Sequence, residues 1–410
     1  MSIIELGGDS QPRSQGGDSE VGQSGLADRN RFGGGVPRAR SLVDIFSATV
    51  VRCCERTALD APDGSLSYAQ LAGAATTLAS RLRAAGLGPG DRVGVRVSSG
   101  TAELYVAILG VLHSGAAYVP VDAEDPLERA RKLWQHADVS AVVRDGLEIE
   151  PLSTPRSTGR ELIVDDDAWV ILTSGSTGEP KAVAVTHRSA AAFVDAEAAL
   201  FSIDIEDRVL AGLSVGFDAS CEEMWLAWRH GAALVPASRA LVRAGEDLGS
   251  WIAGCGVTIV STVPTLAAMW DEPALAGVRL LILGGEACPQ SLGWRLPAGR
   301  EVWNTYGPTE ATVVSTATRV RPGEPVTLGW PLRGWEIAVL DDEGRPVALG
   351  GEGELVIAGV GLGRYLDEQL DAQRYAPVPW LGLTAPTGRE TWSERRSTAC
   401  SSGLATPAGS

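Results

Sequence analysis

The hydrophobic pattern changes period several times along the chain, and each change predicts a switch between helix and strand. Short apolar runs at 92–97 and 168–172 are typical of buried strands, whereas 67–85 and 102–113 carry the three-to-four-residue spacing of amphipathic helices. The alternation resumes after residue 189. Because helices that alternate with strands at this spacing usually connect parallel strands, the pattern predicts an α/β fold with parallel sheet.

Further elements follow from the same reasoning. A helix is expected to begin at Leu42, where an amphipathic pattern first emerges. The remaining expected helices cover 189–200 and 220–229, and the remaining expected strands cover 118–122, 208–213, 232–236, 257–261 and 280–283.

The two ends of the chain differ from this pattern. Residues 1–38 are rich in Gly, Ser, Gln and Asp and poor in large apolar residues, so we expect them to be disordered. Beyond about residue 320 the pattern changes to short β segments with Gly/Pro turns, among them a hairpin turn at 341–344 and a strand at 353–358. A small β-rich subdomain is therefore expected over about 320–382.

Composition narrows the classes of protein further. The 410 residues are 44% hydrophobic, enough for a large core divided over two or three domains. A net charge of −16 argues against nucleic acid or an anionic membrane as the main partner. The six cysteines form no C-x-x-C pair and, with four histidines, no zinc spacing. With no apolar run of membrane-spanning length and no signal sequence, we expect a soluble cytoplasmic protein.

The first candidate for chemistry follows the apolar run 168–172. It reads Thr-Ser-Gly-Ser-Thr-Gly-Glu-Pro-Lys from Thr173 to Lys181. Its glycines let the backbone turn N–H groups inward, its hydroxyls add donors and Lys181 adds a positive charge, which together predict a phosphate-binding loop. The order of these residues differs from the Walker pattern, so an ordinary P-loop NTPase is disfavoured. A plain Ser/Gly surface loop is the alternative.

Six motifs in a fixed order carry a family resemblance. They are Leu66–Leu71, Ser114–Asp122, the loop 171–181, Phe217–Ser220, Asn304–Glu310 and Gly353–Gly359. From about Leu42 to Gly382 the chain resembles the large core of an adenylation domain of a nonribosomal peptide synthetase, in the adenylate-forming enzyme superfamily. Ala182 departs from the family's usual glycine. The resemblance implies two parallel-sheet α/β subdomains and a small β-barrel-like subdomain.

The resemblance also implies an ATP site. Lys181 would hold the β- and γ-phosphates together with the loop residues Thr173, Ser174, Gly175, Ser176, Thr177 and Gly178. Tyr306 would stack on adenine, Thr309 would touch the α-phosphate and Glu310 would bind Mg²⁺, so that Lys181, Thr309 and Glu310 are the implied catalytic residues. The backbone of Gly285, Glu286 and Ala287 would flank the adenine. Taken alone, Tyr306 is a turn tyrosine and Glu310 an acid at a helix N-terminus.

The implied reaction needs positioning and charge neutralisation and no protein nucleophile. The carboxylate of an amino acid attacks the α-phosphorus of ATP, pyrophosphate leaves, and an aminoacyl-adenylate forms. By resemblance, phosphopantetheine on a separate peptidyl carrier domain of the full-length parent then accepts the aminoacyl group.

The family's substrate-pocket positions point to a basic amino acid. Asp218 would pair with the α-ammonium group, because a buried acid needs a charged partner. Glu222 would add one negative charge that suits lysine, ornithine or β-lysine, although Glu223 sits beside it and an acid on the helix surface is the alternative. Segments 188–195 and 219–228 resemble lysine homopolymer (poly-ε-lysine type) synthetases. The full set of implied pocket positions is Asp218, Ala219, Glu222, Ser261, Ile282, Gly284, Thr305, Val313 and Val314.

The resemblance ends near Gly382. The family continues with a Tyr-Arg-Thr-Gly-Asp-Leu motif and a mobile subdomain carrying a catalytic lysine, whereas residues 383–410 are an aperiodic Thr/Ser/Arg/Gly-rich tail. Codons permitted for 386–393 encode Tyr-Arg-Thr-Gly-Asp-Leu-Val in a shifted frame, so we hypothesise that 383–410 are a non-native frameshift product. Adenylation by the chain as given is then expected to be impaired.

Two other functions remain open from the sequence. An acyl- or aryl-CoA ligase of the same superfamily is one, and Asp218 argues against it. A catalytically inactive ligand-binding or interaction module is the other, and the retained Lys181, Tyr306 and Glu310 favour descent from an active enzyme.

Overall fold

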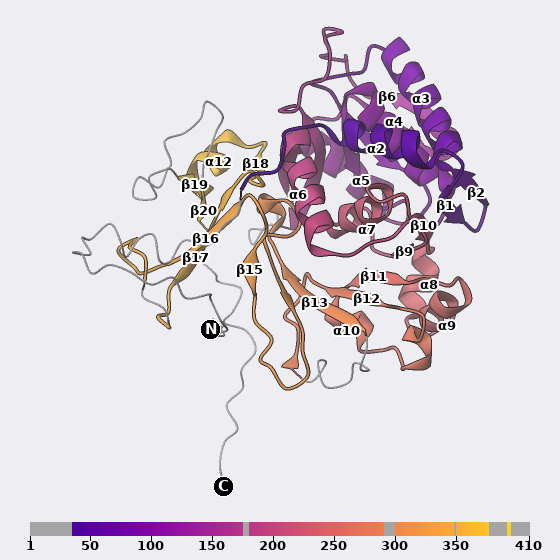
Figure 1. Cartoon of the computed structure of the whole chain (residues 1–410). Helices are drawn as coiled ribbons and strands as arrows, with labels where there is room; N and C mark the ends of the chain where they lie inside the picture. Colours follow the sequence, from indigo (N-terminus) through magenta and orange to yellow (C-terminus); the bar gives the residue numbers. More distant parts are fainter. Residues whose placement is uncertain (1–34, 175–179, 291–299, 348–349, 377–391, 395–410) are drawn as a thin grey trace.

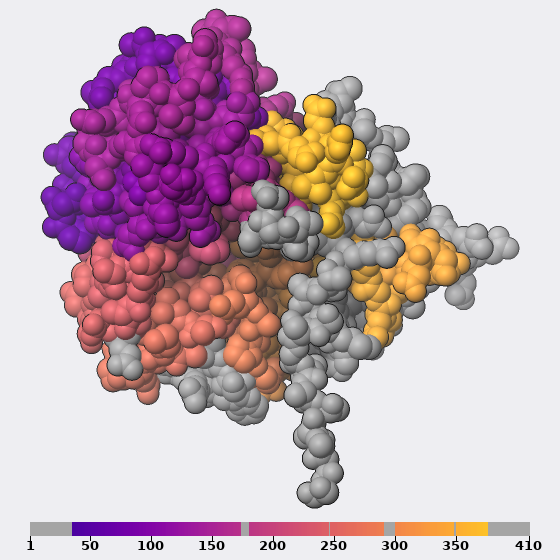
Figure 2. Space-filling view, turned by 180° about the vertical axis from the view of Figure 1, so that it is seen from behind, coloured from indigo at the N-terminus to yellow at the C-terminus, as the bar shows by residue number. Residues whose placement is uncertain are grey.

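The computed structural model describes residues 35–174, 180–290, 300–347, 350–376 and 392–394 (Figure 1). Within these ranges the chain forms two large sheets and one small sheet, with helices packed between and around them. Seen from behind, the part coloured indigo to magenta lies above the part coloured salmon to orange, and the yellow segment around α12 (Glu368–Arg374) lies at the side (Figure 2). Most of 1–38 and most of 383–410 lie outside the described residues.

The first large sheet contains the strands on either side of the expected phosphate loop. Its strands are β3 (Arg92–Arg96), β4 (Ala117–Pro120), β5 (Ala141–Arg144), β6 (Glu148–Pro151), β7 (Asp167–Ser174), β8 (Pro180–Thr186) and β18 (Arg364–Tyr365). Their order is β18-β8-β7-β4-β3-β5-β6, in which β7, β4, β3 and β5 are parallel. The outer strands β6, β8 and β18 are antiparallel to their neighbours.

The second large sheet carries three residues of the expected substrate pocket, Ser261, Ile282 and Thr305. Its strands are β1 (Thr57–Ala61), β2 (Gly64–Ser67), β9 (Arg208–Ala211), β10 (Ala233–Pro236), β11 (Ile259–Thr262), β12 (Leu280–Leu283), β13 (Glu301–Tyr306), β14 (Thr316–Arg319) and β15 (Trp330–Pro331). Their order is β15-β14-β13-β12-β11-β9-β10-β1-β2. The six strands from β13 to β1 in this order are parallel, and β2, β14 and β15 are antiparallel.

A small antiparallel sheet follows. It consists of β16 (Trp335–Leu340), β17 (Glu354–Gly359), β20 (Trp392–Glu394) and β19 (Tyr375–Ala376) in that order. The hairpin turn expected at 341–344 is confirmed, since the Gly344 N–H donates a 2.9 Å hydrogen bond to the Asp341 carbonyl. Strand β20 lies inside the predicted tail, and its three residues leave the frameshift hypothesis untested.

The helices lie in layers defined by the two large sheets. The bounds are α2 (Leu42–Cys53), α3 (Tyr68–Ala84), α4 (Ala102–Ser114), α5 (Leu127–His136), α6 (His187–Leu200), α7 (Ala219–Trp228), α8 (Arg239–Ala244), α9 (Glu246–Gly254) and α10 (Pro264–Ala267), with short 3₁₀ turns at Asp145–Leu147, Pro273–Leu275 and Thr309–Ala311. Helices α2, α3, α4, α6 and α7 share one core with both sheets, α5 covers the far face of the first sheet, and α9 covers that of the second. No helix in the described ranges combines the length and apolar character needed to cross a bilayer.

Local chemistry explains where the first two helices begin. Ser41 accepts a 3.0 Å hydrogen bond from the Asp44 N–H while Asp44 accepts one of 2.8 Å from the Ser41 N–H, and Ser67 and Gln70 repeat this capping box at α3. Each box satisfies backbone donors that have no partner inside the helix. The helix expected to begin at Leu42 is thereby confirmed.

The predicted α/β fold with parallel sheet is confirmed, and both large sheets also carry antiparallel strands toward their edges. The sequence pattern identified β7 but not β8, which returns antiparallel to it, and it missed the β1–β2 hairpin at the opposite edge of the second sheet. The physical reason is that period and apolar runs indicate a strand without fixing its direction.

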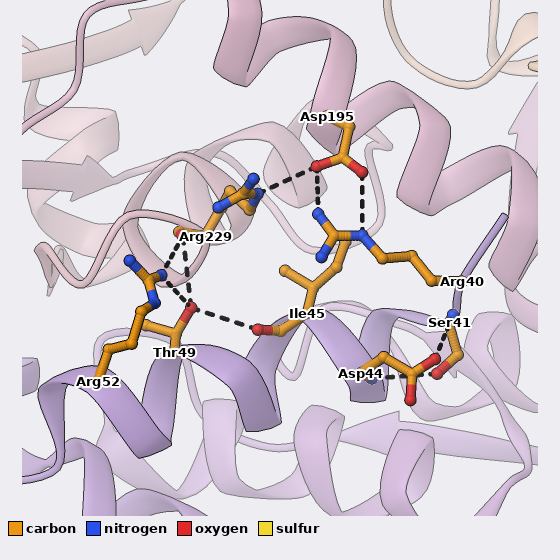
Figure 3. Close-up of polar contacts among 8 residues, drawn as sticks. All are labelled: Arg40, Ser41, Asp44, Ile45, Thr49, Arg52, Asp195 and Arg229. Carbon is orange, nitrogen blue, oxygen red and sulfur yellow. Dashed lines mark hydrogen bonds and ion pairs between the residues drawn. The ribbon is translucent and has the colours of Figure 1, made fainter. Parts of the chain in front are cut away.

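A charged network fixes helices α6 and α7 against the start of α2 (Figure 3). Asp195 on α6 accepts a 2.9 Å bond from Arg40 Nε and a 3.0 Å bond from Arg229 Nε, just past the end of α7. Arg52 on α2 donates to the Arg229 carbonyl at 3.2 Å, and Thr49 donates to the same carbonyl at 3.3 Å. These bonds therefore hold α6 and α7 in a defined position against α2.

Candidate active site

The carboxyl ends of three adjacent parallel strands place pocket residues side by side. In the register of β11, β12 and β13, Ser261 lies opposite Ile282, and Leu283 lies opposite Asn304. Crevices beyond the carboxyl ends of parallel strands are the usual ligand sites of such sheets. The predicted pocket residues on these strands thus meet at one edge.

Gly284 and Thr305 are packed too closely for a side chain at position 284. A Cβ there would lie 2.5 Å from Thr305 Oγ1, whose hydroxyl donates to the Leu283 carbonyl at 3.3 Å. Glycine at 284 therefore serves close packing against Thr305 in addition to any room that it leaves for substrate.

Asp218 and Thr309 come together across the site. Asp218 stands at the N-terminus of α7, and the Thr309 side chain, in the 3₁₀ turn after β13, hydrogen-bonds its carboxylate. The Asp218 Oδ2 atom is buried and has no hydrogen-bond donor among the described residues. Burial raises the pKa of Asp218, Glu310 adds to the rise, and Thr309 and the Ala219 N–H oppose it. No ion pair within the described residues involves Asp218, so burial disfavours its charged form unless a cation binds there.

Glu222 is buried at the next turn of the same helix. Its side chain is 2% exposed, so the alternative of a helix-surface acid is wrong. Ser261 Oγ donates a 2.6 Å hydrogen bond to Glu222 Oε2, while Oε1 has no donor among the described residues. Glu223 is also buried, but it faces the other way and accepts from the Gly212 N–H at 2.8 Å. Only one of the two acids thus lies toward Ser261.

Glu310 is held by residues that follow the second sheet. Its side chain is 2% exposed, and Tyr365 Oη donates a 2.5 Å hydrogen bond to Oε1. The Glu310 carbonyl accepts from the Gly363 N–H at 2.8 Å and from Tyr375 Oη at 3.2 Å. No group of three or more potential metal-ligating side chains is present in the described part of the chain. A single carboxylate nevertheless suits Mg²⁺, which in nucleotide sites takes most of its ligands from phosphates and water.

The two ends of the expected phosphate loop meet in the first sheet. Thr173 on β7 and Lys181 on β8 are cross-strand partners, as are Ser174 and Pro180. The antiparallel return of β8 therefore brings Lys181 beside Thr173. The predicted loop residues Gly175, Ser176, Thr177 and Gly178 lie outside the described residues.

Tyr306 and the segment 285–287 lie at the ends of two neighbouring strands. Tyr306 is the last residue of β13, and Gly285, Glu286 and Ala287 come directly after β12. Glu286 Oε2 accepts a 3.1 Å hydrogen bond from the Thr265 N–H, which fixes this exposed turn. Since β12 and β13 are parallel, the two segments leave the sheet at the same edge.

Backbone strain occurs where the pocket wall turns. Thr312 and Val313 have φ angles of 59° and 63°, a left-handed conformation that is rare for β-branched residues. Thr312 Oγ1 donates to the Gly361 carbonyl at 2.5 Å, and the Val314 N–H donates to the Thr312 carbonyl at 2.7 Å. These bonds hold the buried Val313 and Val314 in place, and such strain gathers at functional sites.

Glu197 on α6 is a buried acid beside Glu222 that sequence reasoning missed. It is 2% exposed and lies within hydrogen-bonding reach of Glu222. The sequence does contain a signal that Glu197 is buried. It follows Phe193 by four residues and Val194 by three, which places it on the buried face of the helix.

Comparison with known proteins agrees with the motif resemblance. The family model described as "AMP-binding enzyme" matches residues 46–169 and 150–365. The chain belongs to this family. Its fold is therefore the α/β fold of adenylate-forming enzymes, as predicted.

Two relatives of this family member are named as synthetases. The chain is 37% identical over 366 residues to phosphinothricin tripeptide synthetase PhsC of Streptomyces viridochromogenes, covering 83% of this chain and 33% of that protein. It is 35% identical over 359 residues to delta-poly-L-ornithine synthetase of Acinetobacter baumannii, covering 83% of this chain and 27% of that protein. The AMP-binding chain thus spans about a third or less of these two relatives.

Solved structures show the same fold. The N-terminal subdomain of Klebsiella oxytoca NpsA is similar with a TM-score of 0.74 and 26% identity, covering 88% of this chain and 96% of that one. A four-domain nonribosomal peptide synthetase bound to AMP and glycine is similar with a TM-score of 0.76 and 28% identity, covering 89% of this chain and 28% of that one.

Proposed function

We propose that this AMP-binding chain activates an amino acid with a basic side chain as its aminoacyl-adenylate. The amino acid carboxylate attacks the α-phosphorus of ATP, a P–O bond forms, and the bond to pyrophosphate breaks. The thiol of phosphopantetheine on a carrier domain then attacks the aminoacyl carbonyl, so that a thioester forms and AMP leaves. The similarity to several peptide synthetases supports this proposal.

Within this proposal, the residues at the ends of β7, β8 and β13 handle ATP. Thr173 and Lys181 hold the β- and γ-phosphates with the loop between them, and Tyr306 stacks on adenine beside the 285–287 segment. Thr309 contacts the α-phosphate, and Glu310 holds Mg²⁺, which neutralises phosphate charge when bound. The meeting of Thr173 and Lys181 across two strands supports their joint role.

The observation that carries the proposal is the half-satisfied Asp218 carboxylate. Thr309 engages the carboxylate, and the buried Oδ2 atom has no donor among the described residues. An α-ammonium group would supply both the missing donor and the missing charge. The same Thr309 is assigned to the α-phosphate, so the contact would place the amino acid beside the phosphorus that its carboxylate attacks.

A basic side chain is favoured by Glu222 and by one relative. Glu222 is buried with one oxygen lacking a donor, and an apolar substrate would leave it so. The similar protein from Acinetobacter baumannii is named delta-poly-L-ornithine synthetase. Lysine, ornithine and β-lysine are the candidates that we propose.

An aryl- or acyl-activating enzyme is the second candidate. The NpsA N-terminal subdomain has been solved in complex with 3-hydroxybenzoyl-AMSN, so an aryl ligand occurs on a similar fold. An aryl acid brings no α-ammonium to Asp218, which makes this candidate weaker. An inactive ligand-binding remnant is the third candidate, and a measurement of adenylation activity separates it from an enzyme.

Equilibrium binding tests the proposal on the chain as it stands. Non-hydrolysable sulfamoyl-adenosine analogues carrying lysyl, ornithyl, phenylalanyl and benzoyl groups are titrated calorimetrically. We expect the lysyl or ornithyl analogue to bind at least about tenfold more tightly than the other two. Preference for the benzoyl analogue would contradict amino acid activation, and absence of binding by all four would contradict an adenylate-binding site in this chain.

A further inference from the structure

Two buried carboxyl groups face each other between helices α6 and α7. Glu197 and Glu222 are each 2% exposed, and each has one carboxyl oxygen without a hydrogen-bond donor among the described residues. Ser261 is the donor to the remaining oxygen of Glu222, at 2.6 Å. No ion pair in the described part of the chain involves either glutamate. Among the described residues the pair therefore has one carboxyl oxygen on each side without a donor, and no cation as a partner.

The pair needs a proton in the absence of ligand. The carboxyl groups of Glu197 and Glu222 lie within hydrogen-bonding reach of each other, and a hydrogen bond between two carboxyl groups requires that one of them carries a hydrogen. Burial raises the pKa of both groups. The neighbouring titratable groups on α7, Asp218 and Glu223, are acidic, and Arg239 acts on Glu223 instead of on the pair. The surroundings thus favour one shared proton over two negative charges.

The position of the pair matches the second charge of a basic amino acid. Asp218 and Glu222 are four residues apart on α7, so they lie on one face about 6 Å apart along the axis. A basic amino acid carries its two ammonium groups at opposite ends of a short carbon chain. With the α-ammonium at Asp218, the distal ammonium reaches the level of Glu222 and Glu197.

We propose that Glu197 and Glu222 together form the binding site for the distal ammonium of the substrate, and that this ammonium takes the place of their shared proton. The ligand remains a cation, the carboxyl proton leaves to solvent, and two carboxylates face one ammonium. Glu197 is thus a specificity-determining residue at a position outside the pocket set deduced from the sequence. This inference rests on the proposed function.

Proton release during binding is the test. Lysyl-sulfamoyl-adenosine and its 6-hydroxynorleucyl counterpart, in which a hydroxyl replaces the distal ammonium, are titrated calorimetrically at neutral pH in buffers of different ionisation enthalpy. The lysyl analogue is expected to release roughly one proton per molecule bound, and the hydroxyl analogue none. Because this comparison uses the unaltered chain, it does not depend on any variant folding.

Variants then locate the effect. Glu197→Gln leaves an amide that can still hydrogen-bond Glu222, so we expect the fold to persist, proton release to vanish and the lysyl analogue to bind about tenfold or more weakly. Affinity for the hydroxyl analogue should change little. Glu223→Gln is the matched control, a buried acid on the same helix that faces Gly212, and it should keep both proton release and ligand preference.

The outcomes separate this inference from the proposed function. Tight lysyl binding without proton release, unchanged in Glu197→Gln, would overturn the inference and leave amino acid activation standing. Binding of phenylalanyl or benzoyl analogues in preference to both basic ones would overturn the inference together with the proposed substrate class. Binding of none of the analogues would overturn both.

Discussion

Tyr365 donates its hydroxyl to Glu310 at 2.5 Å, joining a strand of the first sheet to the turn that follows the second. In our account Glu310 holds Mg²⁺, so Tyr365 is a positioning residue for the metal's carboxylate. Neither residue is near the other in sequence, and the contact follows from β18 pairing with β8.

Tyr365→Phe should weaken Mg·ATP binding about tenfold, because a hydrogen bond to a charged group contributes roughly 1.5–3 kcal/mol. Titration of ATP at a series of Mg²⁺ concentrations measures this. Tyr375→Phe is the control, since its hydroxyl donates to the Glu310 carbonyl and not to the carboxylate. Equal Mg²⁺ dependence in the two variants would contradict the positioning role.

Asp218→Asn should weaken aminoacyl-analogue binding by about two orders of magnitude and leave ATP binding almost unchanged. The reason is that a buried charge–charge contact with the α-ammonium is replaced by a neutral one. Calorimetric titration with the lysyl analogue and with ATP alone measures the two effects. If both affinities fall together, Asp218 supports the fold and does not select the amino acid.

The network in Figure 3 should contribute to stability. Asp195→Asn removes the charge facing Arg40 and Arg229, whose side chains are 25% and 30% exposed, and should lower the free energy of unfolding by about 1–3 kcal/mol. Arg345→Ala breaks an exposed pair with Asp341 and should cost no more than about 1 kcal/mol. Urea denaturation compares them, and a smaller loss in Asp195→Asn than in Arg345→Ala would refute the prediction.

His187 should make the protein sensitive to acid. Burial lowers the pKa of His187 from 6.5 to about 4, with Asp166 and Asp44 opposing this and His113 adding to it. The unfolded chain binds a proton near pH 6.5 and the folded chain only near pH 4, so stability falls as the pH drops through that window. The expected loss is on the order of 3 kcal/mol.

The acid prediction is checked by urea denaturation between pH 7 and about pH 4. His187→Gln should show a shallower loss of stability over that range. Some slope should remain, because burial also lowers the pKa of His230 to about 4. An unchanged slope in the variant would show that His187 is not the group responsible.

The sequence allowed prediction of the motifs but not of all their contacts. Apolar runs and helical spacing identified β7, β12, α6 and α7, because burial on one face or both leaves a periodic pattern. Strand β8 and its antiparallel pairing with β7 were missed, since the residues of a strand do not specify which strand it pairs with. The left-handed backbone at Thr312 and Val313 was also missed, because neither residue type favours that conformation.

Glu197 illustrates the remaining limit. Its spacing from Phe193 places it on a buried face, but a helical pattern does not reveal which buried group it meets. The contact with Glu222 depends on how α6 packs against α7. Bonds between residues far apart in sequence, such as Arg40 and Arg229 to Asp195, contribute to that packing. Pairwise contacts of this kind require the folded structure.

The most direct test of the central claim is amino-acid-dependent exchange between ATP and pyrophosphate. It would use this chain beside a restored version in which the frameshift hypothesised near Gly382 is reversed, with lysine, ornithine, arginine, 6-hydroxynorleucine and phenylalanine as substrates. Our account predicts exchange stimulated by lysine or ornithine and not by 6-hydroxynorleucine, most clearly in the restored version. Stimulation by phenylalanine alone, or by no amino acid in either version, would contradict it.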